Sequence, residues 1–206
     1  RETSGDYYDF IPLPAGRLGL VIADVVDKGM GAALYMALSR TLIRTYAVRF
    51  PNQPELVLSN ANQRILDETH TGMFVTVFYG ILDPHKGEFR YCNAGHNPPL
   101  VLSPGGEIRT LEPTGTILGL FEAAFEVEEI PFEPDSLLVA FSDGVTEAMN
   151  RDDEEYGDDR LQELVARLSR LAPAALRDAI LDDVERFTGG APPGDDVTLV
   201  IVKREA

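Results

Sequence analysis

Uninterrupted apolar runs, separated by Gly and Pro, predict most of the strands of this chain. The stretches 18–26 (LGLVIADVV) and 74–82 (FVTVFYGIL) are rich in β-branched residues and almost wholly apolar, which is typical of buried strands. The turn DPHKGE separates the second stretch from 89–93, and this arrangement predicts a β-hairpin. The remaining predicted strands are several short ones within 98–132 and two longer ones at 136–142 and 197–203.

Other parts of the chain repeat apolar residues at helical spacing. Between residues 32 and 50, such a pattern is formed by Leu34, Leu38, Leu42 and Ile43. We therefore predict a long amphipathic helix with these residues on its apolar face. Further helices are predicted at 56–67 and, separated near Pro173, within 158–187, and an exposed acidic loop is predicted at 151–159.

The order of these elements is mixed. The chain begins with a strand and a pair of helices, continues with a block of antiparallel strands, and ends with a second pair of helices and a final strand. Strands and helices therefore do not alternate as they would in a parallel doubly wound sheet. The pattern predicts an α+β fold in which antiparallel sheets are covered on the outside by helices.

Length, composition and charge narrow the functional class. The chain has 206 residues, 44% hydrophobic and 25% charged, and it has no run of 18 apolar residues that would predict a membrane span. No signal-peptide pattern follows Arg1, and the single Cys92 excludes internal disulfides, so we expect a cytoplasmic domain. The net charge of −16 comes from 34 acidic against 18 basic side chains. Such a charge repels nucleic acid and anionic lipid, so we expect no nucleic-acid partner and no membrane contact.

Four aspartates share one sequence context. Asp6, Asp24, Asp143 and Asp195, or its neighbour Asp196, each lie where an apolar run meets a Gly-containing turn. Carboxylates are hard ligands that suit Mg²⁺ or Mn²⁺, and two such ions about 4 Å apart can activate a water for attack on phosphorus. Without cations, each pair of carboxylates about 4 Å apart repels by about 1 kcal/mol in water and about 4 kcal/mol at an effective dielectric near 20. Aspartates also stabilise turns, and spacing alone does not establish that these four converge.

Seven motifs carry a resemblance to a known family. In chain order they are SGDYYDF (4–10), LVIADVVDKGMGAAL (20–34), FVTVFYGILD (74–83), YCNAGHNPPLVL (91–102), GTILGL (115–120), LLVAFSDGVTEAMN (137–150) and GDDVTLVIV (194–202). Together they resemble the bacterial metal-dependent serine phosphatases of the PPM group that are related to stage II sporulation protein E. The resemblance implies one domain over 1–206, with two antiparallel sheets in a sandwich flanked by helices (four layers, αββα), and a centre of two Mn²⁺ or Mg²⁺ ions.

The resemblance also assigns roles to residues. It implies that Asp24 bridges the two ions with help from the Val25 carbonyl, that Asp24 and Asp143 are the catalytic aspartates, and that Asp6 and Asp195 complete the ligands. Asp196 is the alternative to Asp195. No histidine follows Asp24 as in eukaryotic relatives. Either water or another side chain then protonates the leaving group, or this protonation matters less, and Lys28 and His96 are the candidate side chains. For His96 we favour a structural role, in a turn with Asn93 and Asn97. The candidate residues are therefore Asp6, Asp24, Val25, Asp143 and Asp195, followed by Asp196, Lys28 and His96.

The implied function is hydrolysis of phosphoserine on a regulatory protein by metal-activated water. The resemblance suggests an anti-anti-sigma factor as the substrate, so that dephosphorylation frees a sigma factor by partner switching. The alternative is a catalytically silent module that binds the phosphoprotein on the same fold. Relatives have a strand before the first motif and often an upstream sensor domain, so we expect both to be missing from this chain. A second copy of the chain, in a homodimer, is a further expected partner.

Overall fold

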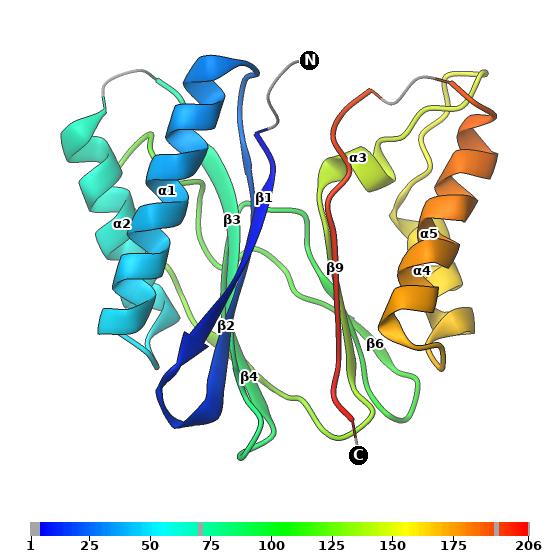
Figure 1. The fold of residues 1–206 in the computed structure, drawn as a ribbon, viewed down its shortest axis with the longest axis horizontal. Helices are drawn as coiled ribbons and strands as arrows, with labels where there is room; N and C mark the ends of the chain where they lie inside the picture. Colours follow the sequence, from blue (N-terminus) through cyan, green and yellow to red (C-terminus); the bar gives the residue numbers. More distant parts are fainter. Residues whose placement is uncertain (1–4, 70–71, 192–193, 206) are drawn as a thin grey trace. The chain divides into compact units, whose positions relative to one another are not determined.

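The computed structural model describes residues 5–69, 72–191 and 194–205. The chain forms two compact units (Figure 1). The first unit comprises Arg1–Pro98 and Glu112–Phe132, and the second comprises Pro99–Leu111 and Glu133–Ala206. Each unit has its own sheet, helices and hydrophobic core.

The first unit is built on a five-stranded sheet in which all neighbouring strands are antiparallel. The strand order is β1-β2-β3-β4-β7. The bounds are Tyr7–Leu13 for β1, Arg17–Val25 for β2, Val75–Asp83 for β3, Glu88–Ala94 for β4 and Glu128–Pro131 for β7, and the 3₁₀ turn Pro14–Gly16 joins β1 to β2. The predicted hairpin at 74–93 is confirmed as β3 and β4.

The sequence indicates an apolar run after Asp6 without giving its bounds, and the structure has strand β1 there, with side chains that alternate strictly. Tyr7, Asp9, Ile11 and Leu13 are buried, and the residues between them are exposed. The alternation is the usual mark of a strand with one face against a core, but Asp9 occupies a buried position and hides the pattern. Because β1 lies at the edge of the sheet, Pro12 is tolerated there.

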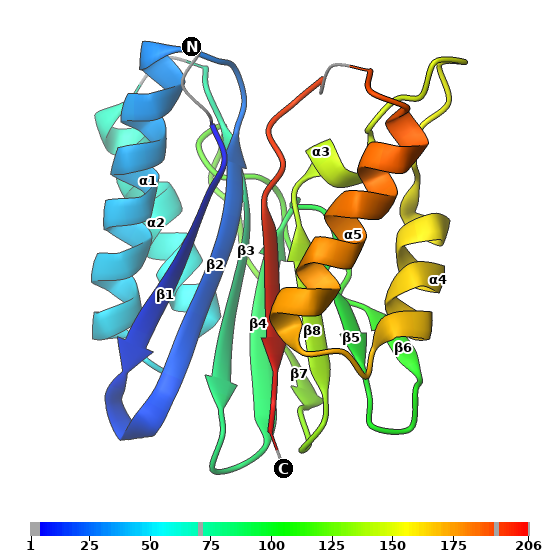
Figure 2. The same cartoon turned by 45° about the vertical axis from the view of Figure 1, so that its right-hand side comes forward.

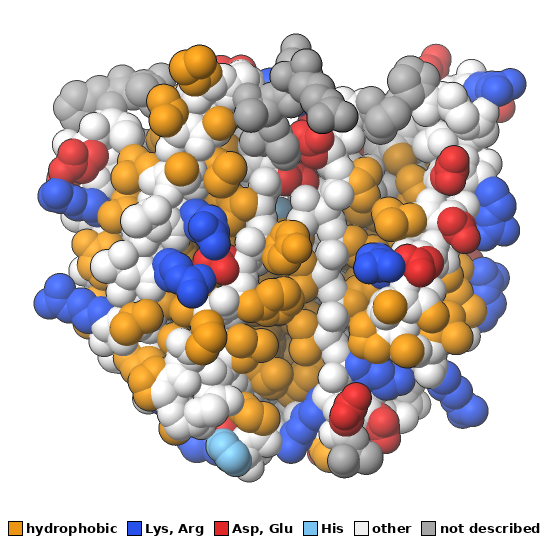
Figure 3. All heavy atoms as spheres, in the orientation of Figure 1, with side chains coloured by type: hydrophobic (Ala, Val, Ile, Leu, Met, Phe, Trp, Pro, Cys, Tyr) orange, Lys and Arg blue, Asp and Glu red, His pale blue; other side chains and the backbone are white. Residues whose placement is uncertain are grey.

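Helices α1 (Met30–Arg49) and α2 (Pro54–Glu68) cover one face of this sheet (Figures 1 and 2). The predicted apolar face of α1 is wrong in part. Leu34 is 67% exposed, and Met30, at the start of the helix, is 80% exposed. Hydrophobic side chains therefore gather on the outer surface over the start of α1 (Figure 3). The buried face consists of Ala32, Tyr35, Ser39, Ile43 and Ala47.

The size of the side chains explains the difference on α1. Ala32, Ser39 and Ala47 are small, so the helix backbone can approach the sheet closely along this stripe. The leucine pattern reflects hydrophobicity alone, whereas the orientation of the helix depends on which face can pack closely against β1 and β2. Of the four residues predicted for the apolar face, only Ile43 is fully buried.

The second unit contains a four-stranded antiparallel sheet in the order β6-β5-β8-β9. Its strands are β5 (Leu100–Leu102), β6 (Ile108–Thr110), β8 (Leu137–Phe141) and β9 (Leu199–Lys203), and its helices are α3 (Asp143–Thr146), α4 (Asp158–Leu168) and α5 (Pro173–Thr188). The predicted division of 158–187 into two helices is confirmed, since Pro173 opens α5.

The acidic loop predicted at 151–159 is exposed from Arg151 to Glu155, but Tyr156 is only 2% exposed. The Tyr156 hydroxyl donates a 2.8 Å hydrogen bond to Asp183, and its ring meets Phe187 edge-on at 5.5 Å. One aromatic side chain thus anchors an otherwise solvated loop to α5. The sequence does not indicate this contact, because the residues around Tyr156 are polar.

The predicted fold class is confirmed, because the chain is α+β with two antiparallel sheets and helices packed against them. Within the described ranges, none of the helices combines the length and the hydrophobicity needed to cross a membrane.

Candidate active site

The first unit brings Asp6 and Asp24 to the same end of the β1–β2 ladder. Tyr7 pairs with Ala23, so Asp6 continues the ladder opposite Asp24, and the Val25 amide donates a 3.3 Å hydrogen bond to the Gly5 carbonyl. Asp24 is half-buried and lies opposite Thr76 on β3. Two predicted ligands therefore lie on neighbouring strands, at the edge where the chain leaves the sheet toward α1.

Gly5 is required by a close contact. A Cβ atom on Gly5 would lie 2.5 Å from the Val25 carbonyl oxygen and 3.1 Å from Oδ1 of Asp24. The first distance is shorter than Cβ contacts permit, so a larger residue would push the Asp6 segment away from β2. The close approach of the two backbones is thus a reason for glycine at this position.

A buried hydrogen-bond network supports the backbone at Asp24. The Thr76 hydroxyl donates to the Asp24 carbonyl at 3.4 Å and lies 2.9 Å from Nδ1 of His96. His96 is 1% exposed, and Asn93 holds its backbone through bonds of 2.9 Å to the His96 amide and 3.1 Å to the His96 carbonyl. The structural role favoured for His96 is thereby supported by its contacts with Asn93, and a solvent-exposed general acid is not located at this position.

The second acidic residue of the first motif has a different role from Asp6. Asp9 is 8% exposed and accepts two hydrogen bonds from Arg44 at 2.9 and 2.8 Å, with Arg40 at 3.3 Å. Both arginines are on α1, so this ion pair fixes the helix to β1. Removing one partner of such a buried pair would leave an uncompensated charge.

The second unit brings Asp143 close to the segment of Asp195 and Asp196. Asp143 follows β8, and the two neighbouring aspartates precede β9, its antiparallel partner. Ser142 joins the two segments, because its amide donates to the Thr198 carbonyl at 3.0 Å and its Oγ accepts from the Thr198 amide at 2.9 Å. Asp143 is half-buried, whereas both C-terminal aspartates are exposed.

Gly144 lets these two segments touch. A Cβ atom at this position would lie 2.1 Å from the carbonyl oxygen of Asp196 and 3.5 Å from the carbonyl carbon of Asp195. Each unit thus pairs aspartates at one end of an antiparallel strand pair, with a glycine at the contact between the two backbones. Gly5 beside Asp6 and Gly144 beside Asp143 are visible in the sequence, but the backbone that each glycine touches is not.

Glu147 is a neighbouring carboxylate that the sequence did not single out. Partial desolvation and the negative charges of Asp143, Glu155 and Asp195, in that order, raise the pKa of its side chain. The signal available in the sequence was its place in SDGVTE, one helical turn after Asp143. Negative charge is therefore concentrated at this end of the second unit.

The remaining predicted positions are distributed as follows. Lys28 is exposed in the connection from β2 to α1, and Val25 offers its carbonyl oxygen beside Gly5. Among the described residues, no group of three or more His, Cys, Asp or Glu side chains is arranged to hold a metal ion. The structure thus supplies two acidic pairs, Asp6 with Asp24 and Asp143 with Asp195 or Asp196, and their joint action remains a prediction.

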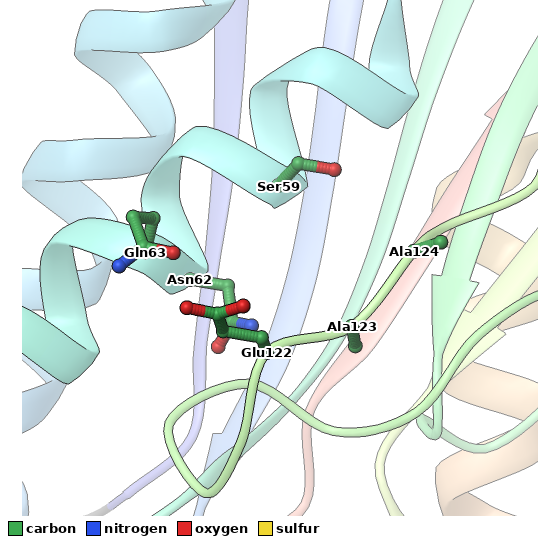
Figure 4. A pocket seen from close by; sticks show the side chains of 6 residues that line it. All are labelled: Ser59, Asn62, Gln63, Glu122, Ala123 and Ala124. Atoms are coloured by element: carbon green, nitrogen blue, oxygen red, sulfur yellow. The ribbon is translucent and has the colours of Figure 1, made fainter.

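A small polar pocket on the first unit lacks the groups for this chemistry (Figure 4). It has a volume of about 360 Å³ and is lined by Ser59, Asn62, Gln63, Glu122, Ala123 and Ala124. The Asn62 amide donates to the Phe121 carbonyl at 3.0 Å and accepts from the Gly119 amide at 2.8 Å. Its role is to fix the 119–124 segment to α2.

Comparison with known proteins identifies the family. The model of the family described as stage II sporulation protein E (SpoIIE) matches residues 14–205. Protein IcfG from Synechocystis sp. is 31% identical over 236 residues, which cover 99% of this chain and 36% of IcfG. Phosphoserine phosphatase RsbU from Bacillus subtilis is 29% identical over 211 residues, which cover 100% of this chain and 61% of RsbU.

Solved structures agree with this assignment. The structure of the RsbU and RsbW domains of Rv1364c from Mycobacterium tuberculosis superimposes with a TM-score of 0.80 and 30% identity, covering 98% of this chain and 56% of that one. The chain spans less than two thirds of the length of each of these three relatives. By its sequence and its fold, the chain belongs to the stage II sporulation protein E family of bacterial PPM-type phosphatase domains.

Proposed function

We propose that this domain hydrolyses phosphoserine on a regulatory protein and that it needs two divalent cations, Mn²⁺ or Mg²⁺, to do so. The observation that carries the proposal is the repeated arrangement of aspartates at the end of a strand pair, with a glycine at the backbone contact, in both units. The proposal is also supported by the relative named phosphoserine phosphatase RsbU, whose match covers 100% of this chain.

The residues present fit such cations. Oδ1 of Asp24 and the Val25 carbonyl oxygen both face the small space beside Gly5, so two hard oxygen donors lie close together there. The other proposed ligands, Asp6, Asp143 and Asp195, are also carboxylates, and this all-oxygen donor set suits Mg²⁺ and Mn²⁺ rather than Zn²⁺.

When bound, the cations lower the pKa of a coordinated water and offset charge on the phosphoryl oxygens. The chain's own residues supply the positions. Gly5 and Gly144 keep the acidic segments in contact with their neighbouring strands, and Thr76 with His96 holds the Asp24 backbone. The buried thiol of Cys92 donates to the Glu126 carbonyl, and burial raises its pKa to about 12, so it is unsuited to act as a nucleophile.

For the substrate, we propose a phosphorylated anti-anti-sigma-type protein in a partner-switching pathway of the cytoplasm. In Rv1364c an RsbU domain occurs together with an RsbW domain, which supports a regulatory context. A sensor domain and a second copy of the chain are the further partners that we propose.

The test is release of phosphate from a phosphoserine protein and from an aryl phosphate, with saturating Mn²⁺ and again with chelator. We expect release that requires metal and is lost in Asp143→Asn. Asp178→Asn, which changes an exposed aspartate on α5, is the matched control and should retain full activity. Metal binding by calorimetry without any phosphate release would refute the proposal in favour of a silent phosphoprotein-binding module.

A further inference from the structure

The second unit contains an apolar pocket beside its acidic pair. The pocket has a volume of about 510 Å³, within the range of pockets that take small ligands or side chains. Its walls come from Gly144 of α3, the 147–149 segment, the last turns of α5 and the residues that lead into β9. Figure 2 shows α3, α5 and the approach to β9 side by side in this unit.

Exposed hydrophobic side chains of the second unit are concentrated in this pocket. Met149 is 45% exposed, Leu181 is 39% exposed and Val197 is 40% exposed, and all three line it. Among the described residues of the second unit, Leu171 is the one other large hydrophobic residue that is comparably exposed, at 37%, and it does not line the pocket. Exposed apolar side chains that gather in one concave site mark a binding surface rather than random surface composition.

The charges in the pocket are all negative. Glu147, Glu185 and Asp195 line it, and its described lining includes no Lys or Arg. Arg151 is nearby, where its guanidinium donates a 2.7 Å hydrogen bond to the Gly189 carbonyl, but it does not line the pocket. An occupant should therefore combine an apolar group with a positive charge.

We infer that this pocket recognises the substrate protein, by accepting an apolar side chain near the phosphoserine while an adjacent Lys or Arg lies against the acidic lining. The inference rests on the proposed phosphatase function, because Asp195 belongs both to the pocket and to the second acidic pair. A segment bound at that pair therefore has its neighbouring residues within reach of Met149, Leu181 and Val197.

A second copy of the chain is the weaker occupant. Each copy carries a net charge of −16, so association through a pocket lined by three carboxylates would bring like charges together. A basic substrate segment is instead attracted by the same field.

The test uses the four methionines of the chain, of which Met149 is the one that lines the pocket. The chain is labelled with ¹³C at the methionine methyl groups, and the Met149 signal is identified with Met149→Leu. It is titrated, in saturating Mg²⁺, with nine-residue peptides that carry a central non-hydrolysable phosphonate analogue of phosphoserine and a Leu-Lys pair moved along either side. For turnover measurements the same peptides carry phosphoserine. A matched series carries Asp-Asp in place of Leu-Lys.

We expect one placement of Leu-Lys to shift the Met149 signal saturably, while the Met30, Met36 and Met73 signals stay in place and the Asp-Asp peptide has no effect. Leu181→Arg should abolish the shift, with Leu181→Ser as a milder second variant, and the control Leu171→Arg should retain it. With Mn²⁺, the kcat/KM for the Leu-Lys peptide should exceed that for its Asp-Asp counterpart by about tenfold or more. Leu181→Arg should remove this preference.

The outcomes separate the inference from the proposed function. A Met149 signal that no peptide shifts, or that the Asp-Asp peptide shifts equally, would overturn the inference even if the chain is an active phosphatase. A specific Met149 shift without any phosphate release would support the pocket and refute the proposed function. A shift that depends on protein concentration alone would assign the pocket to a second copy and would also overturn the inference.

Discussion

Gly144→Ala is the most direct test of how the second acidic pair is positioned. The added methyl group would lie 2.1 Å from the Asp196 carbonyl oxygen, whereas ordinary van der Waals contact begins at 3.4 Å. The atom in the way belongs to the backbone, so no side-chain rotation relieves the clash. Either α3 or the segment before β9 has to move by about 1 Å.

The cost follows from this geometry. Overpacking of a well-packed site typically destabilises a protein by about 1–3 kcal/mol. The displacement also stretches the link through Ser142, whose Oγ accepts from the Thr198 amide at 2.9 Å and donates to the Asp196 carbonyl at 3.4 Å. A shift of about 1 Å in catalytic groups can lower turnover by about 10²-fold. We therefore expect a loss of activity much larger than the loss of stability explains.

The assay compares Gly144→Ala with Gly194→Ala in the same part of the unit. A Cβ at Gly194 would have no heavy atom of the described residues within 4 Å, so the control lacks the backbone clash and should have a much smaller effect than Gly144→Ala. Urea denaturation gives the free energy of unfolding, calorimetry gives Mn²⁺ affinity, and phosphate release gives kcat. The free energy of unfolding, the Mn²⁺ affinity and kcat should all fall in Gly144→Ala, and all three should stay close to their wild-type values in Gly194→Ala.

The reasoning would be refuted by a Gly144→Ala protein with unchanged stability and unchanged turnover. Reduced stability with normal kcat and Mn²⁺ affinity would also count against it, because the contact would then be structural without positioning the acids.

Three further predictions concern charge and protonation. Asp143→Asn should lose Mn²⁺ affinity in calorimetry, yet in chelator its melting temperature should not fall below that of the wild type, because removing one carboxylate relieves repulsion on the order of 1 kcal/mol; a clear loss of stability in chelator would argue against neighbouring acids. Burial raises the pKa of Cys92 to about 12, so only about one thiol in 10⁴ is ionised at pH 8, and iodoacetamide should label it in urea but not in the native chain; fast native labelling would contradict its burial. Desolvation is the largest cause that raises the pKa values of Tyr7, Tyr79 and Tyr156, so above about pH 10 the unfolded chain loses protons that the native chain keeps. The free energy of unfolding should then fall by up to about 1.4 kcal/mol per tyrosine and pH unit, as urea midpoints against pH would reveal; a midpoint that stays constant above pH 10 would disprove this.

The fold followed from the sequence where one physical signal was sufficient. Buried strands such as 136–142 are apolar throughout, and Pro173 separates α4 from α5, so composition and proline alone predict them. The prediction failed where two signals conflicted. On α1 hydrophobicity pointed to Leu34, but the sheet accepts the narrow stripe of Ala32, Ser39 and Ala47, because close packing depends on side-chain volume as well as polarity.

The candidate site divides in the same way between what is local and what is not. Aspartates close to glycines are a local pattern, and in the structure these aspartates lie at or near the ends of β1, β2, β8 and β9. The need for glycine depends on residues that are distant in sequence. Gly5 is confined by the Val25 carbonyl and Gly144 by the Asp196 carbonyl. The sequence suggests a turn at such positions, whereas the structure reveals a backbone contact. The two explanations predict different mutants: an alanine is tolerated in a turn without positive φ, but it is excluded from a contact of 2.1 Å. For this reason the glycines, which carry no chemistry of their own, are as informative a test of the acidic pairs as the aspartates.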